Sequence, residues 1–246
     1  MDGYDGKYGD TLVKAYAYLT RQALVLLEPY LREETLVRLH EEMDREGEAI
    51  LARLPDIGGR KNLFSPIIVF NGWLIALHKA VLAERLPVVL TPYVGRAVFE
   101  RMVHKIPRPI GRLIGVLTFS GLGRRFLAKQ ADQSQKEVYP ADFVYTFTTA
   151  KVGHEVEAEF VFMACAVHKL YEAEGVPELK AYCNFADPVY ASYFHMGCDA
   201  SATLAQGFDV CTLNFNNRRG TATPDNIKVM IYEAEQHLLK LKADNR

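Results

Sequence analysis

The spacing of apolar residues changes near Pro140, and this change limits the fold more than any other feature of the chain. Before Pro140, apolar residues recur every three to four positions; after it, they alternate with polar residues in Phe143–Thr149 and Glu155–Met163. The first period is typical of a helix with one buried face, and the second of a strand. Helices followed by antiparallel strand pairs predict the α+β class, with a mostly helical N-terminal half packed on a small antiparallel sheet formed by C-terminal hairpins.

Apolar stripes predict several helices before Pro140. The expected ranges are Thr11 to about Pro29, Glu33–Leu54, Leu63–Leu86, Thr91–His104 and Ile106–Phe126. Residues 1–10 hold three glycines and no apolar period, so a loose arm is expected there. No linker rich in Pro, Gly or Ser separates the helical part, 11–137, from the α+β part, 141–246. The sequence therefore predicts a single domain over 1–246.

Two segments raise the question of a membrane. Leu63–Leu86 is strongly apolar, but Asn71, His78 and Lys79 interrupt it before it reaches the roughly 20 apolar residues that a bilayer requires. We therefore expect a buried helix and no stable membrane insertion. Ile106–Phe126 combines basic residues with a short apolar block and could lie on a membrane surface. The preferred interpretation is a helix with basic ends, packed on its neighbours or lining a substrate entrance.

Charge and cysteine content narrow the class of protein. The chain has 29 basic and 30 acidic residues, a balance that does not favour nucleic acid as a partner. Four cysteines without a signal-peptide pattern predict free thiols and a cytoplasmic location. The composition is compatible with a homo-oligomer. The sequence lacks a phosphate loop and a dinucleotide fingerprint, so the polar residues between Cys165 and Asn214 are the candidate site.

A second hairpin is predicted near the C-terminus. Ala200–Ala205 and Asp209–Phe215 read as strands joined by a turn at Gln206–Phe208. Alternation puts Asp209 and Cys211 on the same face as Leu213 and Phe215. A three-residue turn would place Thr203 opposite Cys211.

The residues of this region resemble a known family. Cys183, the TLAQG segment Thr203–Gly207, Asp209 and the Cys211-x-x-x-Phe215 spacing are similar to the motif of the L-2-amino-thiazoline-4-carboxylic acid hydrolases. The resemblance covers Phe143–Phe215 and implies a small-molecule substrate, a five-membered cyclic isothiourea opened by hydrolysis toward a carbamoyl-cysteine. Ala200 stands where an arginine is expected, so a related ring is included among the expected substrates.

The resemblance and the local chemistry give the candidate site residues. A nucleophilic cysteine needs a lowered thiol pKa. Cys183 lies just before a predicted helix that begins at Asp187-Pro188, and the positive end of a helix dipole favours the thiolate. The catalytic candidates are Cys183, Asp187, His195, Asp209 and Cys211, and the substrate-binding candidates are Tyr190, Thr203, Gln206 and Asn214. Either a thiolate attacks the ring directly, or a carboxylate activates water while the cysteines shape the pocket. The sequence does not choose between these routes.

The cysteines and histidines of this region could also form a zinc site. The possible ligands are Cys165-x-x-His168, Cys183, His195-x-x-Cys198 and Cys211. They are dispersed among presumed strands and helices instead of standing in tight knuckles, so a zinc is not favoured and no cofactor is expected. Glu155, Glu157 and Glu159 share one face of a strand, where a solvated sheet edge is favoured over a metal site.

A non-enzymatic class is the alternative. The arrangement from Cys183 to Cys211 also looks similar to the C-terminal motif of vinyl-reductase-type sensor domains, which bind hydrophobic ligands, sometimes with a cysteine-bound zinc. In that case the apolar helices between Phe64 and Phe126 would enclose the ligand. Co-purification of an apolar ligand, without turnover of any cyclic substrate, would distinguish a binding protein from a hydrolase.

Overall fold

The chain forms two compact units in a computed structural model, which describes residues 7–218 and 220–245. The helical unit runs to Val98 and also contains Leu170–Val176 and the chain from Val229 onward. The sheet unit comprises Phe99–Lys169 and Pro177–Lys228. Three of the four unit boundaries fall inside helices, which are α4 (Leu90–Val103), α7 (Ala166–Ala173) and α9 (Asp225–Asp244).

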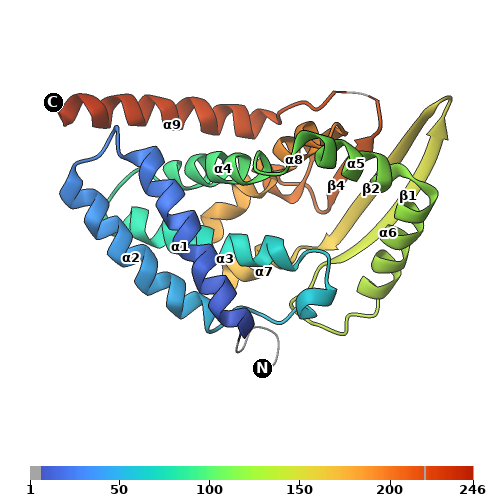
Figure 1. Cartoon of the computed structure of the whole chain (residues 1–246), viewed down its shortest axis with the longest axis horizontal. Coiled ribbons are helices and arrows are strands. Elements are labelled where there is room, and N and C mark those ends of the chain that lie inside the picture. Colours follow the sequence, from blue (N-terminus) through green and yellow to red (C-terminus); the bar gives the residue numbers. More distant parts are fainter. Residues whose placement is uncertain (1–6, 219, 246) are drawn as a thin grey trace. The chain divides into compact units, whose positions relative to one another are not determined.

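The N-terminal helices of the helical unit follow the apolar stripes of the sequence. They are α1 (Lys7–Leu27), α2 (Glu33–Leu51) and α3 (Ser65–Ala83), with a short 3-10 turn at Gly59–Lys61 (Figure 1). Helix α1 begins at Lys7, so the prediction of a loose arm is wrong for residues 7–10. Residues 1–6 of that predicted arm lie outside the described residues.

Helix α3 forms the core of this unit. It is long and apolar enough to cross a membrane by length and composition, but 72% of its most apolar window is buried inside the protein. Trp73 is fully buried, and its indole N–H donates to Thr20 Oγ1 at 3.3 Å. The Tyr16 hydroxyl donates to the carbonyl of Val69 at 3.0 Å. These contacts fit the predicted buried helix, because a buried indole or phenol requires a hydrogen-bond partner.

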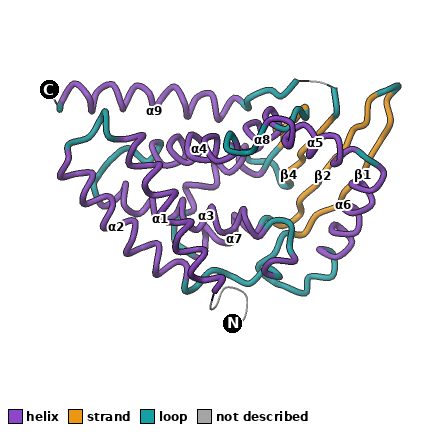
Figure 2. Tube along the Cα trace, in the orientation of Figure 1, coloured by secondary structure: helices purple, strands orange, loops and turns teal. Residues whose placement is uncertain are grey.

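All four described strands lie in the sheet unit, where they form one antiparallel sheet (Figure 2). The strands are β1 (Val144–Val152), β2 (Glu155–Ala164), β3 (Gly197–Ala202) and β4 (Cys211–Asn216), in the order β1-β2-β4-β3. The α+β class and the hairpin of β1 and β2 are confirmed. The second predicted hairpin is confirmed only as an antiparallel pair, because its strands are β3 and β4 and their connection is longer than the predicted turn at Gln206–Phe208. The predicted sheet edge at Glu155, Glu157 and Glu159 is wrong, because β2 pairs with β1 on one side and β4 on the other.

One face of the sheet is aromatic. The pairs Phe160↔Leu213 and Phe162↔Cys211 put residues of β2 and β4 on the same side, since directly opposed residues of antiparallel strands share a face. The Phe160 ring meets that of Phe215 edge-on, with centroids 5.8 Å apart. Cys211 therefore lies at the end of an apolar sheet face, as the alternation in Cys211–Phe215 predicts.

The predicted helix over Ile106–Phe126 is two helices. Helix α5 (Arg108–Phe119) ends at Ser120, and α6 (Gly121–Ser134) begins directly after it. Ser120 has an extended backbone, and its hydroxyl accepts from the Gly123 N–H at 3.0 Å, which is an N-cap. The remaining helical elements of the sheet unit are the 3-10 helix Pro177–Phe185 and α8 (Asp187–Tyr193), followed by a short 3-10 turn at Leu204–Gln206.

Helix α5 contacts the end of α8 through its glycines. A methyl group at Gly115 would overlap the carbonyl oxygen of Phe194, and one at Gly111 would lie 3.3 Å from the Tyr193 ring. Only a residue without Cβ allows this approach of helix and backbone.

We expect Gly115→Ala to lower the free energy of unfolding by about 3 kcal/mol, because α5 must move away from Phe194. Gly121→Ala is the matched control, since a Cβ there meets no described atom within 4 Å. Urea unfolding of the two variants measures the difference. Equal stability of the two variants would contradict the close packing of α5 on this segment.

Candidate active site

The structure brings the four cysteines of the chain around one carboxyl group, that of Asp187. Each thiol interacts electrostatically with Asp187, although the cysteines come from different elements. Cys165 precedes α7, Cys183 lies in the 3-10 helix Pro177–Phe185, Cys198 in β3 and Cys211 at the start of β4. We call these four thiols and Asp187 the thiol cluster. The cysteines that look dispersed in the sequence are thus neighbours in the fold.

Asp187 and Tyr190 form a hydrogen-bonded pair on the first turn of α8. Burial raises the pKa of Asp187 to about 7, and the hydrogen bond from the Tyr190 side chain opposes this shift. The Tyr190 ring packs on Phe215 of the aromatic sheet face, with centroids 6.0 Å apart, which fixes the hydroxyl. A carboxyl group with a pKa near 7 can donate or accept a proton at neutral pH.

Cys183 is paired with His168. Its sulfur lies 3.2 Å from His168 Nε2, across the turn that connects α7 to the 3-10 helix. Burial raises the pKa of the Cys183 thiol well above its ordinary value, and Cys165, Cys211 and Asp187 raise it further. The lowered thiol pKa expected from the sequence is therefore wrong for the resting protein. The thiol is protonated, and the imidazole is the adjacent group that can accept its proton.

His168 was not among the predicted catalytic residues. The sequence signal is the Cys165-x-x-His168 spacing, which by itself suggests only part of a zinc site. His168 and Cys183 are 15 residues apart, and the local pattern does not show that the chain folds back between them.

Backbone N–H groups contact two other thiols of the cluster. Those of Val167 and His168, at the start of α7, donate to the Cys165 sulfur, and that of Leu204 donates to Cys211. Burial nevertheless raises the pKa of Cys165, and it raises that of Cys211 to about 12. Both thiols are therefore neutral at physiological pH.

The TLAQG segment has a structural explanation. Thr203 is fully buried and precedes the 3-10 turn Leu204–Gln206, where its hydroxyl donates to Gln206 Oε1 at 2.6 Å. Gly207 ends the turn with a φ of +87°, which favours glycine. This capped turn holds the Leu204 N–H against Cys211.

The structure corrects the predicted position of Thr203. Pairing of β3 with β4 ends at Ala202↔Thr212, so Thr203 lies in the connection and does not face Cys211 across the hairpin. The connection is longer than the predicted three-residue turn, because the 3-10 turn and an exposed bend separate the strands. Thr203 and Gln206, which were predicted to bind substrate, bind each other.

Three further predicted site residues are exposed. Asp209 is exposed in the bend before β4, because the strand begins at Cys211. Asn214 is exposed and lies on the face opposite to Leu213. His195 is also exposed and follows α8 with a φ of +57°.

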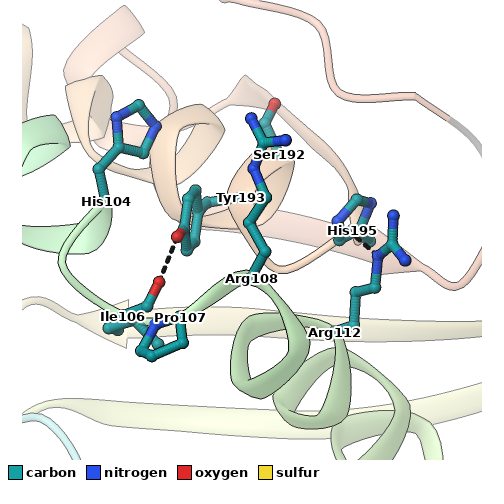
Figure 3. Close-up of a pocket in the computed structure, with 8 residues that line it drawn as sticks. All are labelled: His104, Ile106, Pro107, Arg108, Arg112, Ser192, Tyr193 and His195. Carbon is teal, nitrogen blue, oxygen red and sulfur yellow. Dashed lines mark hydrogen bonds between the residues drawn. The ribbon is translucent and has the colours of Figure 1, made fainter.

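His195 lines a separate pocket of about 570 Å³ (Figure 3). Arg112 donates from Nε to His195 Nε2 at 3.3 Å, and the Tyr193 hydroxyl donates to the carbonyl of Ile106. The side chains of Arg108, His104 and Ser192 also line this pocket. No acidic side chain is found among its described lining residues, so the pocket favours an anion. We call it the arginine pocket.

Over residues 7–218 and 220–245, no group of three or more His, Cys, Asp or Glu side chains is arranged to hold a metal ion. The thiol cluster and its neighbour His168 offer a thiol, an imidazole and a carboxyl group within one half-buried region. These three groups are the parts that nucleophilic catalysis with acid–base assistance requires.

Comparison with known proteins identifies one family. Residues 117–215 match the model of the L-2-amino-thiazoline-4-carboxylic acid hydrolase family. The match includes the whole thiol cluster, His168 and the four described strands except Asn216, the last residue of β4. No curated protein and no solved structure matches the chain. The resemblance inferred from the motif is confirmed: residues 117–215 match the L-2-amino-thiazoline-4-carboxylic acid hydrolase family.

Proposed function

We propose that this protein is a hydrolase that opens a small ring containing nitrogen and sulfur, 2-amino-thiazoline-4-carboxylate or a close relative, at the thiol cluster. The observation that supports the proposal is the Cys183–His168 pair, 3.2 Å apart, next to an Asp187 carboxyl group with a pKa of about 7. The family match over the same residues supports a hydrolytic reaction.

In the first step, His168 takes the thiol proton of Cys183 as the sulfur adds to C2 of the ring. Protonated Asp187 gives its proton to the ring nitrogen, so that the addition creates no free charge on the substrate. The bond between C2 and one ring heteroatom then breaks. The leaving heteroatom takes the proton from the His168 imidazolium, and an amidine carbon stays bound to Cys183.

Water completes the reaction. The Asp187 carboxylate takes a proton from water as the oxygen adds to the amidine carbon. The Cys183 sulfur then leaves, and the proton of the new hydroxyl returns to the thiol through His168. The net change is the addition of one water molecule. Cleavage of the C2–S bond gives N-carbamoyl-cysteine with a free thiol, whereas cleavage of C2–N gives S-carbamoyl-cysteine.

The expected result is turnover of L-2-amino-thiazoline-4-carboxylate, or of a neutral cyclic isothiourea, by the purified protein. Mass spectrometry follows the product, and a thiol-reactive reagent distinguishes the N-carbamoyl from the S-carbamoyl product. Turnover of only the neutral ring would be explained by Ala200, which offers no guanidinium for a ring carboxylate. Arg218 is an exposed alternative partner for that carboxylate, and Arg219 lies outside the described residues.

If no cyclic substrate turns over and an apolar ligand co-purifies with the protein, the binding-protein alternative replaces this proposal. The four cysteines, all within the described residues, are free thiols. A nucleophilic thiol is preserved in a reducing compartment, and we include a cytoplasmic location in the proposal for that reason.

A further inference from the structure

Helices α5 and α6 expose an unusual number of large apolar side chains. Val116 is 68% exposed and Leu122 is 78% exposed. The full set, which we call the apolar stripe, is Ile110, Leu113, Val116, Leu117, Leu122 and Phe126. Six such residues within 17 positions exceed the scattered apolar residues of an ordinary surface, and an exposed patch of this kind marks an interaction site.

The stripe is not the face with which α5 packs in its own unit. Gly111, Gly115 and Phe119 are the buried positions of α5, and the two glycines contact Tyr193 and Phe194. Ile110, Leu113 and Leu117 recur at spacings of three and four, and therefore form a second, outward face of the helix. Helix α5 thus has one face that packs on the protein and another that does not.

The segment that carries the stripe has charged residues of one sign. The segment from Arg101 to Ala131 contains seven of the 29 basic residues of the chain and none of its 30 acidic residues. The chain as a whole is nearly neutral, so this positive charge is concentrated on one segment. A helix with an apolar face and a surplus of basic residues is typical of proteins that lie on an anionic membrane surface.

The arginine pocket lies at the start of the same helix. Arg108 and Arg112 extend from the first turns of α5 toward Ser192 and His195 (Figure 3). Among the described residues no side chain caps the N-terminus of α5, so its first N–H groups add to the positive potential. Two guanidinium groups at a helix N-terminus suit the phosphate of a lipid headgroup.

We propose that α5 and α6 dock this protein on the surface of an anionic phospholipid bilayer, with the apolar stripe in the headgroup region and a lipid phosphate in the arginine pocket. The helices lie on the membrane and do not span it. This inference is independent of the reaction at the thiol cluster.

Two other partners fit the surface less well. A second copy of the chain would place this patch against itself, and the exposed basic residues of the segment would then approach like charges. A nucleic acid would satisfy the arginines but would leave the aliphatic stripe without a partner, because its backbone offers phosphate and sugar. Of these three partners, an anionic lipid surface offers both kinds of contact.

Co-sedimentation with lipid vesicles tests the proposal. The full chain should bind vesicles of phosphatidylglycerol and phosphatidylcholine, bind pure phosphatidylcholine vesicles at least about tenfold more weakly, and lose affinity in 0.5 M NaCl. The double variant Val116→Asp/Leu122→Asp should bind the anionic vesicles at least about thirtyfold more weakly. Val138→Asp/Tyr232→Asp is the matched control, since these residues are 69% and 64% exposed and lie outside the segment.

The headgroup site is tested separately. Arg108→Ala/Arg112→Ala should weaken binding to anionic vesicles about thirtyfold. Each basic residue near the membrane surface contributes about 1 kcal/mol of binding free energy, and about 1.4 kcal/mol corresponds to a tenfold change in affinity. Lys240→Ala, an exposed lysine on α9, should leave vesicle binding unchanged. Competition by 10 mM inorganic phosphate in the wild type, but not in the double arginine variant, would support a phosphate in the pocket.

Two results would overturn the proposal. One is the absence of binding to anionic vesicles at low salt. The other is a dimer in sedimentation analysis that Val116→Asp/Leu122→Asp converts to a monomer without changing vesicle binding, which would assign the stripe to a second copy of the chain.

Discussion

Cys183→Ser is expected to lower kcat/KM for ring opening by at least about a thousandfold, because a serine hydroxyl beside His168 is a much weaker nucleophile than a thiol. His168→Asn should lower it by about 10²- to 10⁴-fold, since the base that accepts the thiol proton is lost. Stability should change little in Cys183→Ser, because the half-buried hydroxyl can keep the hydrogen bond to His168. Product formation measured by mass spectrometry, together with urea unfolding, checks both results.

Cys165→Ser is the matched control for the nucleophile. Its side chain accepts from the N–H groups that begin α7, and a serine can do the same as an N-cap. We expect this variant to keep its activity within about tenfold of the wild type. Full activity in Cys183→Ser, or loss of activity only in Cys165→Ser, would show that Cys183 is not the nucleophile. The mass of the intact protein during turnover should show the substrate adduct only when Cys183 is present.

Asp187→Asn is expected to remove activity and, at alkaline pH, to raise stability. The folded-state pKa of Asp187 is raised to about 7, whereas an unfolded aspartate has a pKa of about 3.9. Between these values the folded protein holds a proton that the unfolded chain has released, so wild-type stability falls as the pH rises from about 4 to about 7. The loss amounts to at most about 4 kcal/mol.

Asparagine cannot ionise, so the variant should lack this loss and be more stable than the wild type at pH 8, but not at pH 4. Urea unfolding at the two pH values gives the comparison. Wild-type kcat/KM should also fall above about pH 7, because the protonated carboxyl group acts in the first step.

Asp209→Asn is the control for this second experiment. Asp209 is exposed and lies outside the thiol cluster. The free energy of unfolding of Asp209→Asn should therefore stay within about 0.5 kcal/mol of the wild-type value at both pH values. If both variants show the same pH dependence of stability as the wild type, Asp187 is not the buried titrating group. If Asp209→Asn removes activity while Asp187→Asn does not, the carboxyl group that assists ring opening has been assigned to the wrong residue.

The sequence by itself determined the fold class and most of the elements. The change of period at Pro140 separated helices from strands, and the alternation in Cys211–Phe215 placed Cys211 on the core face of its strand. These features depend on which residues lie three, four or two positions apart, and that spacing is present in the chain itself. The motif around Cys211 indicated the family for the same reason.

Only the tertiary structure decided which side chains meet. The alternation of polar and apolar residues in β2 fits an edge strand and a central strand equally well. Pairing with β4, which is distant in the sequence, places β2 in the centre of the sheet. The thiol cluster depends on how the segments carrying Cys165, Cys183 and Cys211 fold onto α8, and no periodicity encodes such contacts. His195 lies eight residues from Asp187 but belongs to the arginine pocket, because its positive φ ends α8 and its ring meets Arg112. Burial then raised the pKa of Asp187, and burial is a property of the folded protein and not of the local sequence.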